Sequence, residues 1–183
     1  MRRRAILGLA VSAPLAGVVS DAHADVRLSR RGALIVLGVE GYDQWPRLAT
    51  YFIQFRGVEP SGEFNRNTFR ASNGNVFGDR PPAEYFVIEV RPGRYVAYRT
   101  IIDDGGARRV ETTFCDGTIG FDVPADQVTY IGNYALSGRT GIVLRPPQID
   151  AAAVALAGHP SLPQTMNVAN VGPMAYPPSP DCR

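Results

Sequence analysis

The sequence contains no lysine, so arginine supplies all of its basic side chains apart from two histidines. The formal net charge is +2, and residues 1–24 account for all of it, since they hold three arginines and one aspartate. Residues 25–183 are therefore neutral overall. A neutral domain lacks the dense positive charge that binding to nucleic acid or to strongly anionic membranes requires. The sequence thus predicts that nucleic acid is not a partner.

Histidine is almost absent too, because His159, just before Pro160, is the only one beyond residue 24. A Ser-His-Asp or Cys-His catalytic device would have to use it, and the sequence offers no activating neighbour. We therefore expect no enzyme, with a hydrolase using His159 as the remote alternative. Close Cys and His ligands for zinc are missing, and Asn73, Asn75 and Asp79 lack the usual spacing of a calcium site. The sequence predicts neither a metal nor a cofactor.

Only two cysteines occur, Cys115 and Cys182. In an oxidising compartment such a pair favours a disulfide. The bond would pin the Pro-rich end of the chain to the predicted sheet. The alternative is a buried Cys115 and an exposed Cys182 that never meet, and sequence spacing alone does not decide between the two.

Long apolar runs are few, and the first lies between Arg2–Arg4 and Ala22-His23-Ala24. This order of basic, apolar and small residues is typical of a secretory signal peptide, and Ala5–Val19 is too short and too rich in Ala and Gly to span a membrane. We expect cleavage after Ala24, a periplasmic or extracellular location and no transmembrane span. The Sec route is favoured over the twin-arginine route, whose motif has a Ser or Thr that is missing here.

The chain does contain many β-branched and aromatic runs at short spacing. Tyr85–Val90 and Tyr95–Ile102, separated by Pro92-Gly93, predict two antiparallel strands joined by a turn. Asp116-Gly117 predicts a second hairpin, between Val110–Cys115 and Thr118–Val123. The remaining expected strands are Ala33–Val39 (covered on both faces), Leu48–Arg56, a weak edge strand near Asn67–Ala71, Gln127–Tyr134 and Gly141–Arg145.

Seven to nine short strands without a long helical pattern indicate an all-β sandwich or barrel, and an antiparallel β-sandwich is the form that we predict. One short helix is expected at Ala151–Ala157, with Asp150 as its N-cap and Gly158 in a left-handed conformation at its end. The Pro-rich residues 161–183 are expected to be an extended or disordered tail. The expected organisation is a signal peptide (1–24), a sandwich domain (25–160) and this tail.

Three segments resemble a family of bacterial secreted or lipoprotein domains of unknown function: Pro92-Gly93-Arg94-Tyr95, Phe121-Asp122-Val123 and Val128–Tyr134. Domains of that kind carry a Pro-Gly-x-Tyr hairpin and, later, a Phe-x-Val segment leading into a Tyr-Ile-Gly strand. The resemblance covers roughly residues 33–160 and implies an immunoglobulin- or prealbumin-like sandwich. It implies no chemistry, and this chain departs from the lipoprotein members because it lacks the acylated cysteine.

The candidate site lies on the expected 85–100 hairpin. If Val90 faces Tyr95, then Tyr85 and Tyr98 share one face, which would be suited to stacking on sugar rings or receiving a protein partner. The alternative is that segment 57–82 covers this face. Arg91 and Arg94 lie at or near the turn, where they would hold an anionic glycan or lipid headgroup; the alternative, which the sequence favours, is that they are solvated surface residues. The sequence favours an exported, non-enzymatic, envelope-associated binding or structural module, with a carbohydrate-binding module as the alternative.

Overall fold

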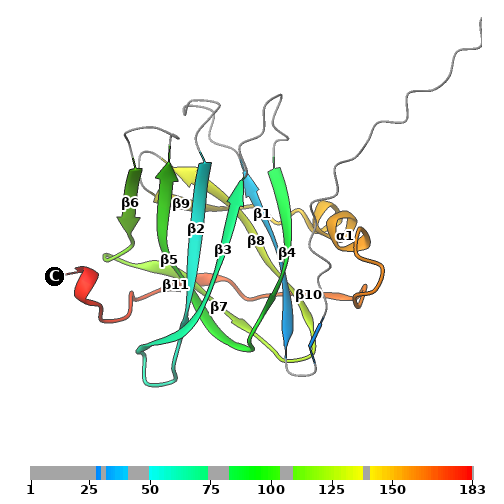
Figure 1. Cartoon of the computed structure of the whole chain (residues 1–183), viewed down its shortest axis with the longest axis horizontal. Coiled ribbons are helices and arrows are strands. Elements are labelled where there is room, and N and C mark those ends of the chain that lie inside the picture. The colour runs from blue at the N-terminus through cyan, green and yellow to red at the C-terminus, as the bar shows by residue number, and fades with distance from the viewer. Residues whose placement is uncertain are drawn as a thin grey trace, which may run out of the picture.

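The computed structural model describes residues 28–29, 32–40, 50–73, 83–103, 109–137 and 141–182. The expected signal peptide and most of the loop with Asn75 and Asp79 lie outside these residues. Within them, eleven strands form two packed sheets, and one α-helix and one short 3-10 helix lie outside the sheets (Figure 1). The all-β sandwich predicted from the sequence is confirmed, and each of the nine expected strands is present.

Sheet A has five strands. β1 lies between β4 and β8, while β9 and β10 share the other edge of β8. β1 and β10 each pair with β8 in parallel. The expected antiparallel meander is therefore wrong at the pairs β1–β8 and β10–β8. The bounds are β1 (Ala33–Glu40), β4 (Ala83–Val90), β8 (Val128–Ser137), β9 (Gly141–Arg145) and β10 (Met166–Val168).

Sheet B has six strands, in the order β11-β7-β5-β2-β3, with β6 also paired to β5. β6 and β7 both run antiparallel to β5 and follow one another along the same edge of it. The expected Asp116-Gly117 hairpin is therefore wrong, because the turn there only offsets β7 from β6. The bounds are β2 (Thr50–Val58), β3 (Phe64–Asn73), β5 (Gly93–Asp103), β6 (Arg109–Thr113), β7 (Thr118–Val123) and β11 (Gly172–Met174).

The expected hairpin around Pro92-Gly93 is also wrong. β4 pairs with β1 in sheet A and β5 pairs with β2 in sheet B, so the chain crosses between the sheets at Arg91-Pro92. Pro92 cannot adopt the positive φ that tight hairpin turns require, which disfavours direct pairing of the two strands. Their apolar side chains still meet, but across the sandwich instead of side by side: Ile88 and Val90 come from one sheet, Tyr95 and Ala97 from the other.

The core lies between the sheets, and its centre is aromatic. Phe55 stacks on Phe69 at 4.6 Å between ring centroids. It also meets Phe121 and Tyr134 edge-on, at 5.7 and 5.4 Å. Alternate residues of β1 enter this core, while Leu34 and Val36 face the opposite side of sheet A. The prediction that Ala33–Val39 is covered on both faces is confirmed.

The helix α1 (Ile149–Ala157) covers the outer face of sheet A with Ala152 and Leu156. The helix is where the sequence predicts it, but its ends differ. The N-cap is Gln148, without a side-chain cap, and Gly158 is right-handed with a φ of −62°. The expected Asp150 cap and left-handed Gly158 are therefore wrong.

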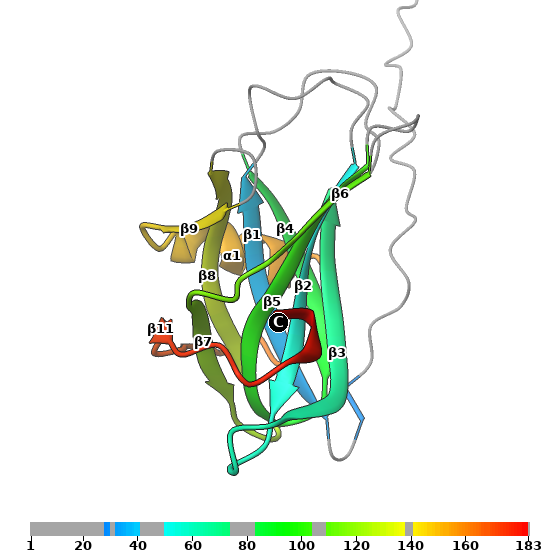
Figure 2. The ribbon, with the colours of Figure 1, turned by 90° about the vertical axis from the view of Figure 1, so that its left-hand side faces the viewer.

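The Pro-rich end of the chain is extended, as expected, and it is packed against the sandwich. It adds β10 to sheet A and β11 to sheet B, and it ends in a 3-10 turn at Pro180–Cys182. Figure 2 shows this segment, in red, crossing the molecule in front of β5 and β2. Residues 161–182 thus contribute to both sheets rather than trailing from them.

Replacing Phe55 by alanine tests the aromatic centre. Phe55 is fully buried among three rings, so Phe55→Ala is expected to lower the free energy of unfolding by about 3–5 kcal/mol in urea denaturation. Val154→Ala, at a side chain of α1 that is 74% exposed, is the control and should stay within about 0.5 kcal/mol. Equal effects of the two changes would contradict this core.

Candidate functional site

Tyr85 lies on the outer face of sheet A, beside the start of α1. Its hydroxyl donates to Gln148 Oε1 (3.1 Å) and accepts from Asn133 Nδ2 (2.9 Å). The Gln148 N–H donates to the Tyr130 hydroxyl (3.0 Å), which donates to Asn133 Oδ1 (2.6 Å). These four residues form a closed ring of hydrogen bonds that fastens the helix to the sheet. Gly38 makes room for it, because a Cβ there would overlap Asn133 Oδ1.

Tyr98 lies on the outer face of the other sheet. Phe64 meets its ring edge-on at 5.3 Å, and Tyr176 stacks on it at 6.1 Å. Its hydroxyl donates to the carboxylate of Asp181, and its side chain is only 6% exposed. The structure therefore does not bring Tyr85 and Tyr98 together. Phe64 belongs to segment 57–82, which the sequence offers as a cover for this face, and it contacts Tyr98. Residues 175–182 complete the cover, and we call residues 175–182 the strap.

A β-bulge explains why Arg99 accompanies Tyr98. Gln54 pairs with Arg99 and Phe55 with Ala97, which leaves Tyr98 as the extra residue of β5. Both Tyr98 and Arg99 then face away from the core, whereas strict alternation places Arg99 on the core face. The guanidinium group of Arg99 lies 5.3 Å from the Tyr98 ring and also bonds to Glu111, at 2.8 Å.

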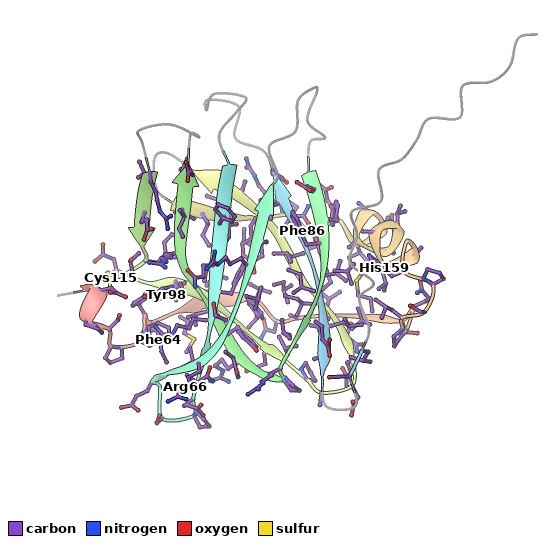
Figure 3. The ribbon with its side chains drawn as sticks, viewed as in Figure 1. Phe64, Arg66, Phe86, Tyr98, Cys115 and His159 are labelled. Carbon is purple, nitrogen blue, oxygen red and sulfur yellow. A yellow bond between two sulfur atoms is a disulfide. The ribbon has the colours of Figure 1, made fainter. Side chains whose placement is uncertain are left out.

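The strap ends in a disulfide between Cys115 and Cys182, with 5.5 Å between their Cα atoms. This confirms the bond that the sequence left open. Closing a loop across 67 positions contributes about 4 kcal/mol by restricting the unfolded chain. The bond also removes the Cys115 thiol from any Cys-His device, and Figure 3 shows Cys115 and His159 at opposite ends of the molecule. His159 is half-buried just beyond α1, and its carbonyl accepts bonds from Gln164.

Arg91 and Arg94 lie at the corner where the chain changes sheets, and they differ in their partners. Arg94 forms a bidentate pair with Asp122, at 2.9 and 3.2 Å, which raises the pKa of the guanidinium. Arg91 has no carboxylate within ion-pair distance among the described residues. Its carbonyl accepts a 2.7 Å bond from the Tyr95 hydroxyl, which fixes the corner. Of the two, Arg91 is thus the one available to a ligand.

Arg91 borders a groove of about 1110 Å³ between β3 and the corner. Arg66 lies on the other side, at the end of β3 (Figure 3), exposed and likewise without an acidic partner among the described residues. Glu89 is the groove's acidic member, and it accepts a 2.8 Å bond from the Ser29 N–H. Hydrogen bonds from Ser29 lower the pKa of this carboxyl. The groove therefore presents two cations without a carboxylate partner among the described residues, and one carboxylate of which a single oxygen accepts the Ser29 bond.

Sequence reasoning missed Arg66. The sequence predicts a weak edge strand near Asn67–Ala71. It gives no indication that this strand begins earlier, at Phe64, or that its beginning lies beside the corner at Arg91. The alternation of Phe69 and Ala71 with polar residues is the one local signal for β3, since both of these side chains are core residues. The neighbourhood of Arg66 depends on the packing of two sheets, which no local pattern encodes.

A second groove, of about 540 Å³, lies among β7, β9 and β11 and is largely apolar. No cluster of acidic, Cys or His side chains suited to a metal is found in the described part of the chain. No helix among those residues is long and apolar enough to cross a membrane. Comparison of the chain with known protein families, curated proteins and solved structures finds no match.

Asn133 tests the hydrogen-bonded ring under α1. Asn133→Ala removes two bonds and leaves the buried hydroxyl of Tyr130 without its acceptor, so the free energy of unfolding should fall by about 1–3 kcal/mol. Asn167→Ala, which removes an exposed bond to Gln127, is the matched control and should cost less than about 0.5 kcal/mol. Urea denaturation of both variants measures this, and a neutral Asn133→Ala would refute the ring.

Asp181 makes the strap sensitive to acid. Hydrogen bonds from Tyr98 and Ser179 lower the pKa of its carboxyl, so ionised Asp181 stabilises the strap above the unfolded pKa. That contribution is lost as the pH falls through the folded pKa. We expect the NMR signals of the Tyr176 ring to shift below about pH 4. In Asp181→Asn this titration should disappear, and its persistence would assign it to another group.

Proposed function

We propose that this chain is an exported, non-enzymatic binding module of the cell envelope that takes an anionic glycan into the groove between Arg66 and Arg91. The observation that carries the proposal is that both exposed guanidinium groups face one groove and lack a carboxylate partner among the described residues. Four arginines elsewhere in the described chain, Arg94, Arg99, Arg109 and Arg145, are paired with acidic side chains.

The chemistry of the groove supports an acidic sugar as the ligand. A guanidinium group forms paired hydrogen bonds to a carboxylate or phosphate, and two of them bind an anion more firmly than one. Asn67 also lines the groove and offers an amide to sugar hydroxyls. The second carboxylate oxygen of Glu89 can accept hydrogen bonds from sugar hydroxyls. The volume is within the range of small-ligand sites.

The disulfide supports an exported location, because such bonds persist in oxidising compartments. We also propose that the sandwich is of the immunoglobulin- or prealbumin-like subtype and that the chain is related to the secreted domains that it resembles. The two packed sheets support them, while the parallel β1–β8 pair is a departure from a purely antiparallel sandwich. A purely structural module is the competing proposal, and it predicts no ligand in this groove.

The experiment is co-sedimentation of the purified chain with peptidoglycan, which carries carboxylates, and in parallel with lipopolysaccharide, which carries phosphates. Arg66→Ala combined with Arg91→Ala should weaken binding by about tenfold or more, and added salt should weaken it further. Arg70→Ala is the matched control, because Arg70 is an exposed arginine of the same strand outside the groove. Tyr85 and Tyr98 are unsuitable for this test, since both are built into the packing.

Three results decide the proposal. Loss of binding in the double variant alone places the site in the groove, and the polymer that is bound identifies the anion. Equal loss in Arg70→Ala would indicate non-specific attraction to the polymer. A parent chain that sediments with neither polymer would favour the structural module.

A further inference from the structure

The strap, residues 175–182, lies on a surface that combines aromatic rings with guanidinium groups. An apolar surface alone would be enough for a segment that only covers the sheet. After β11 it makes no strand pairing, and it crosses the outer face of sheet B to reach Cys115 (Figure 2). That face presents the rings of Phe64 and Tyr98 together with two guanidinium groups. We call these four residues, Phe64, Tyr98, Arg56 and Arg99, the aromatic face.

Cations and rings are interleaved on the aromatic face. Arg56 lies 4.7 Å from the ring of Phe64 and 5.4 Å from that of Tyr98. Arg99 lies 5.3 Å from the same Tyr98 ring. Such contacts place both guanidinium groups close to the rings, and Arg99 also pairs with Glu111 at 2.8 Å.

The strap complements this face residue by residue. Tyr176 packs its ring against both aromatic side chains, 5.4 Å from Phe64 and stacked on Tyr98 at 6.1 Å. Pro177 follows and is buried. Five residues after the tyrosine, the carboxylate of Asp181 accepts the Tyr98 hydroxyl bond and lies in the field of both arginines.

This arrangement has the features of proline-rich peptide recognition. Three of the residues at 177–180 are prolines, which pre-set φ and reduce the entropy lost on binding. Aromatic grooves bind such segments in many interaction domains. A tyrosine anchor and a terminal acid define the direction in which the segment lies.

The bond that holds the strap is open to solvent. Cys115 is exposed, and a groove of about 360 Å³ beside the disulfide is lined by Tyr176, Pro177 and both cysteines. A thiolate of another protein can therefore reach the sulfur of Cys115. Once the disulfide is broken, the strap remains tethered at β11 and competes with any incoming segment as an intramolecular ligand.

We propose that the aromatic face is a recognition site for a partner protein that carries a Tyr-Pro-Pro segment followed by an acidic residue. The strap of this chain occupies the site until the Cys115–Cys182 disulfide is reduced. The site is separate from the groove at Arg66 and Arg91, so the two proposals fail independently.

The opening step is a thiol–disulfide exchange with a dithiol protein as the reductant. One thiolate of the dithiol attacks Sγ of Cys115, a mixed disulfide forms, and Cys182 leaves as a thiolate. The second thiol of the dithiol then attacks the mixed disulfide and releases Cys115. The dithiol becomes a disulfide, two electrons pass to this chain, and each cysteine takes up one proton.

The test is fluorescence anisotropy with a labelled peptide that has the sequence of residues 175–181. It is titrated against the oxidised full chain, the chain reduced with dithiothreitol, and the reduced chain carrying Tyr176→Ala, which weakens its own strap. The oxidised chain should not bind the peptide. The reduced Tyr176→Ala chain should bind at least about tenfold more tightly than the reduced parent, because the tethered competitor is weakened.

Controls address both sides of the contact. In the reduced Tyr176→Ala chain, Arg56→Gln combined with Arg99→Gln should lower peptide affinity about tenfold, whereas Arg70→Gln should leave it unchanged. A peptide with alanine in place of its tyrosine should not bind. Circular dichroism of each variant verifies that the sheets are intact.

If reduction unfolds the chain, the oxidised Tyr176→Ala chain is titrated with the acetylated, amidated tripeptide Tyr-Pro-Pro. Saturable binding that Arg56→Gln abolishes supports the site, and its absence overturns it. With the folded reduced chain, no peptide binding would make the strap a structural element only. A dimer that forms on reduction would assign the site to the strap of a second copy and overturn the proposed partner.

Discussion

The burial of β1 on both of its faces is the constraint on which the remaining structure depends. Residues 33–39 are all buried, so this strand needs a strand at each edge and a layer on each side. Sheet B supplies one layer, and the chain re-enters that sheet at Arg91-Pro92 instead of turning back within sheet A. The helix α1 supplies the other. Neither layer alone would keep water from the strand.

Two different kinds of contact hold the outer layers in place. Polar side chains attach α1, through the ring of hydrogen bonds that joins Tyr85, Asn133, Tyr130 and Gln148. Rings, guanidinium groups and a covalent bond attach the strap. The attachment of the helix therefore weakens when any one hydrogen-bonding partner is removed. The attachment of the strap depends instead on a disulfide, which thiol–disulfide exchange can open and re-form.

Local pattern was sufficient to predict the strands β1 to β9, but it missed β10 and β11, and the pairing between strands was not predictable. Tyr85–Val90 and Tyr95–Ile102 were located correctly and joined wrongly, because the same alternation satisfies a hairpin or a crossing between sheets. The bulge at Tyr98 leaves no mark in the composition, so the sequence does not reveal that Arg99 faces outward together with Tyr98. Arg66 meets Arg91 only through the packing of two sheets. Composition indicated an extended tail, but not the surface that receives it.

The long separation in sequence between β1 and β8 has a consequence for how the molecule is formed. Leu34 pairs with Val128, so the most apolar strand acquires this neighbour only after most of the chain is present. Folding that depends on such distant pairs is slow compared with folding through local contacts. Throughout that interval β1 exposes an unpaired, apolar edge of the kind that seeds aggregation. Pairing of β1 with β4, its nearer partner in the sequence, covers only the other edge, so the edge that receives β8 stays open until residues 128–135 arrive.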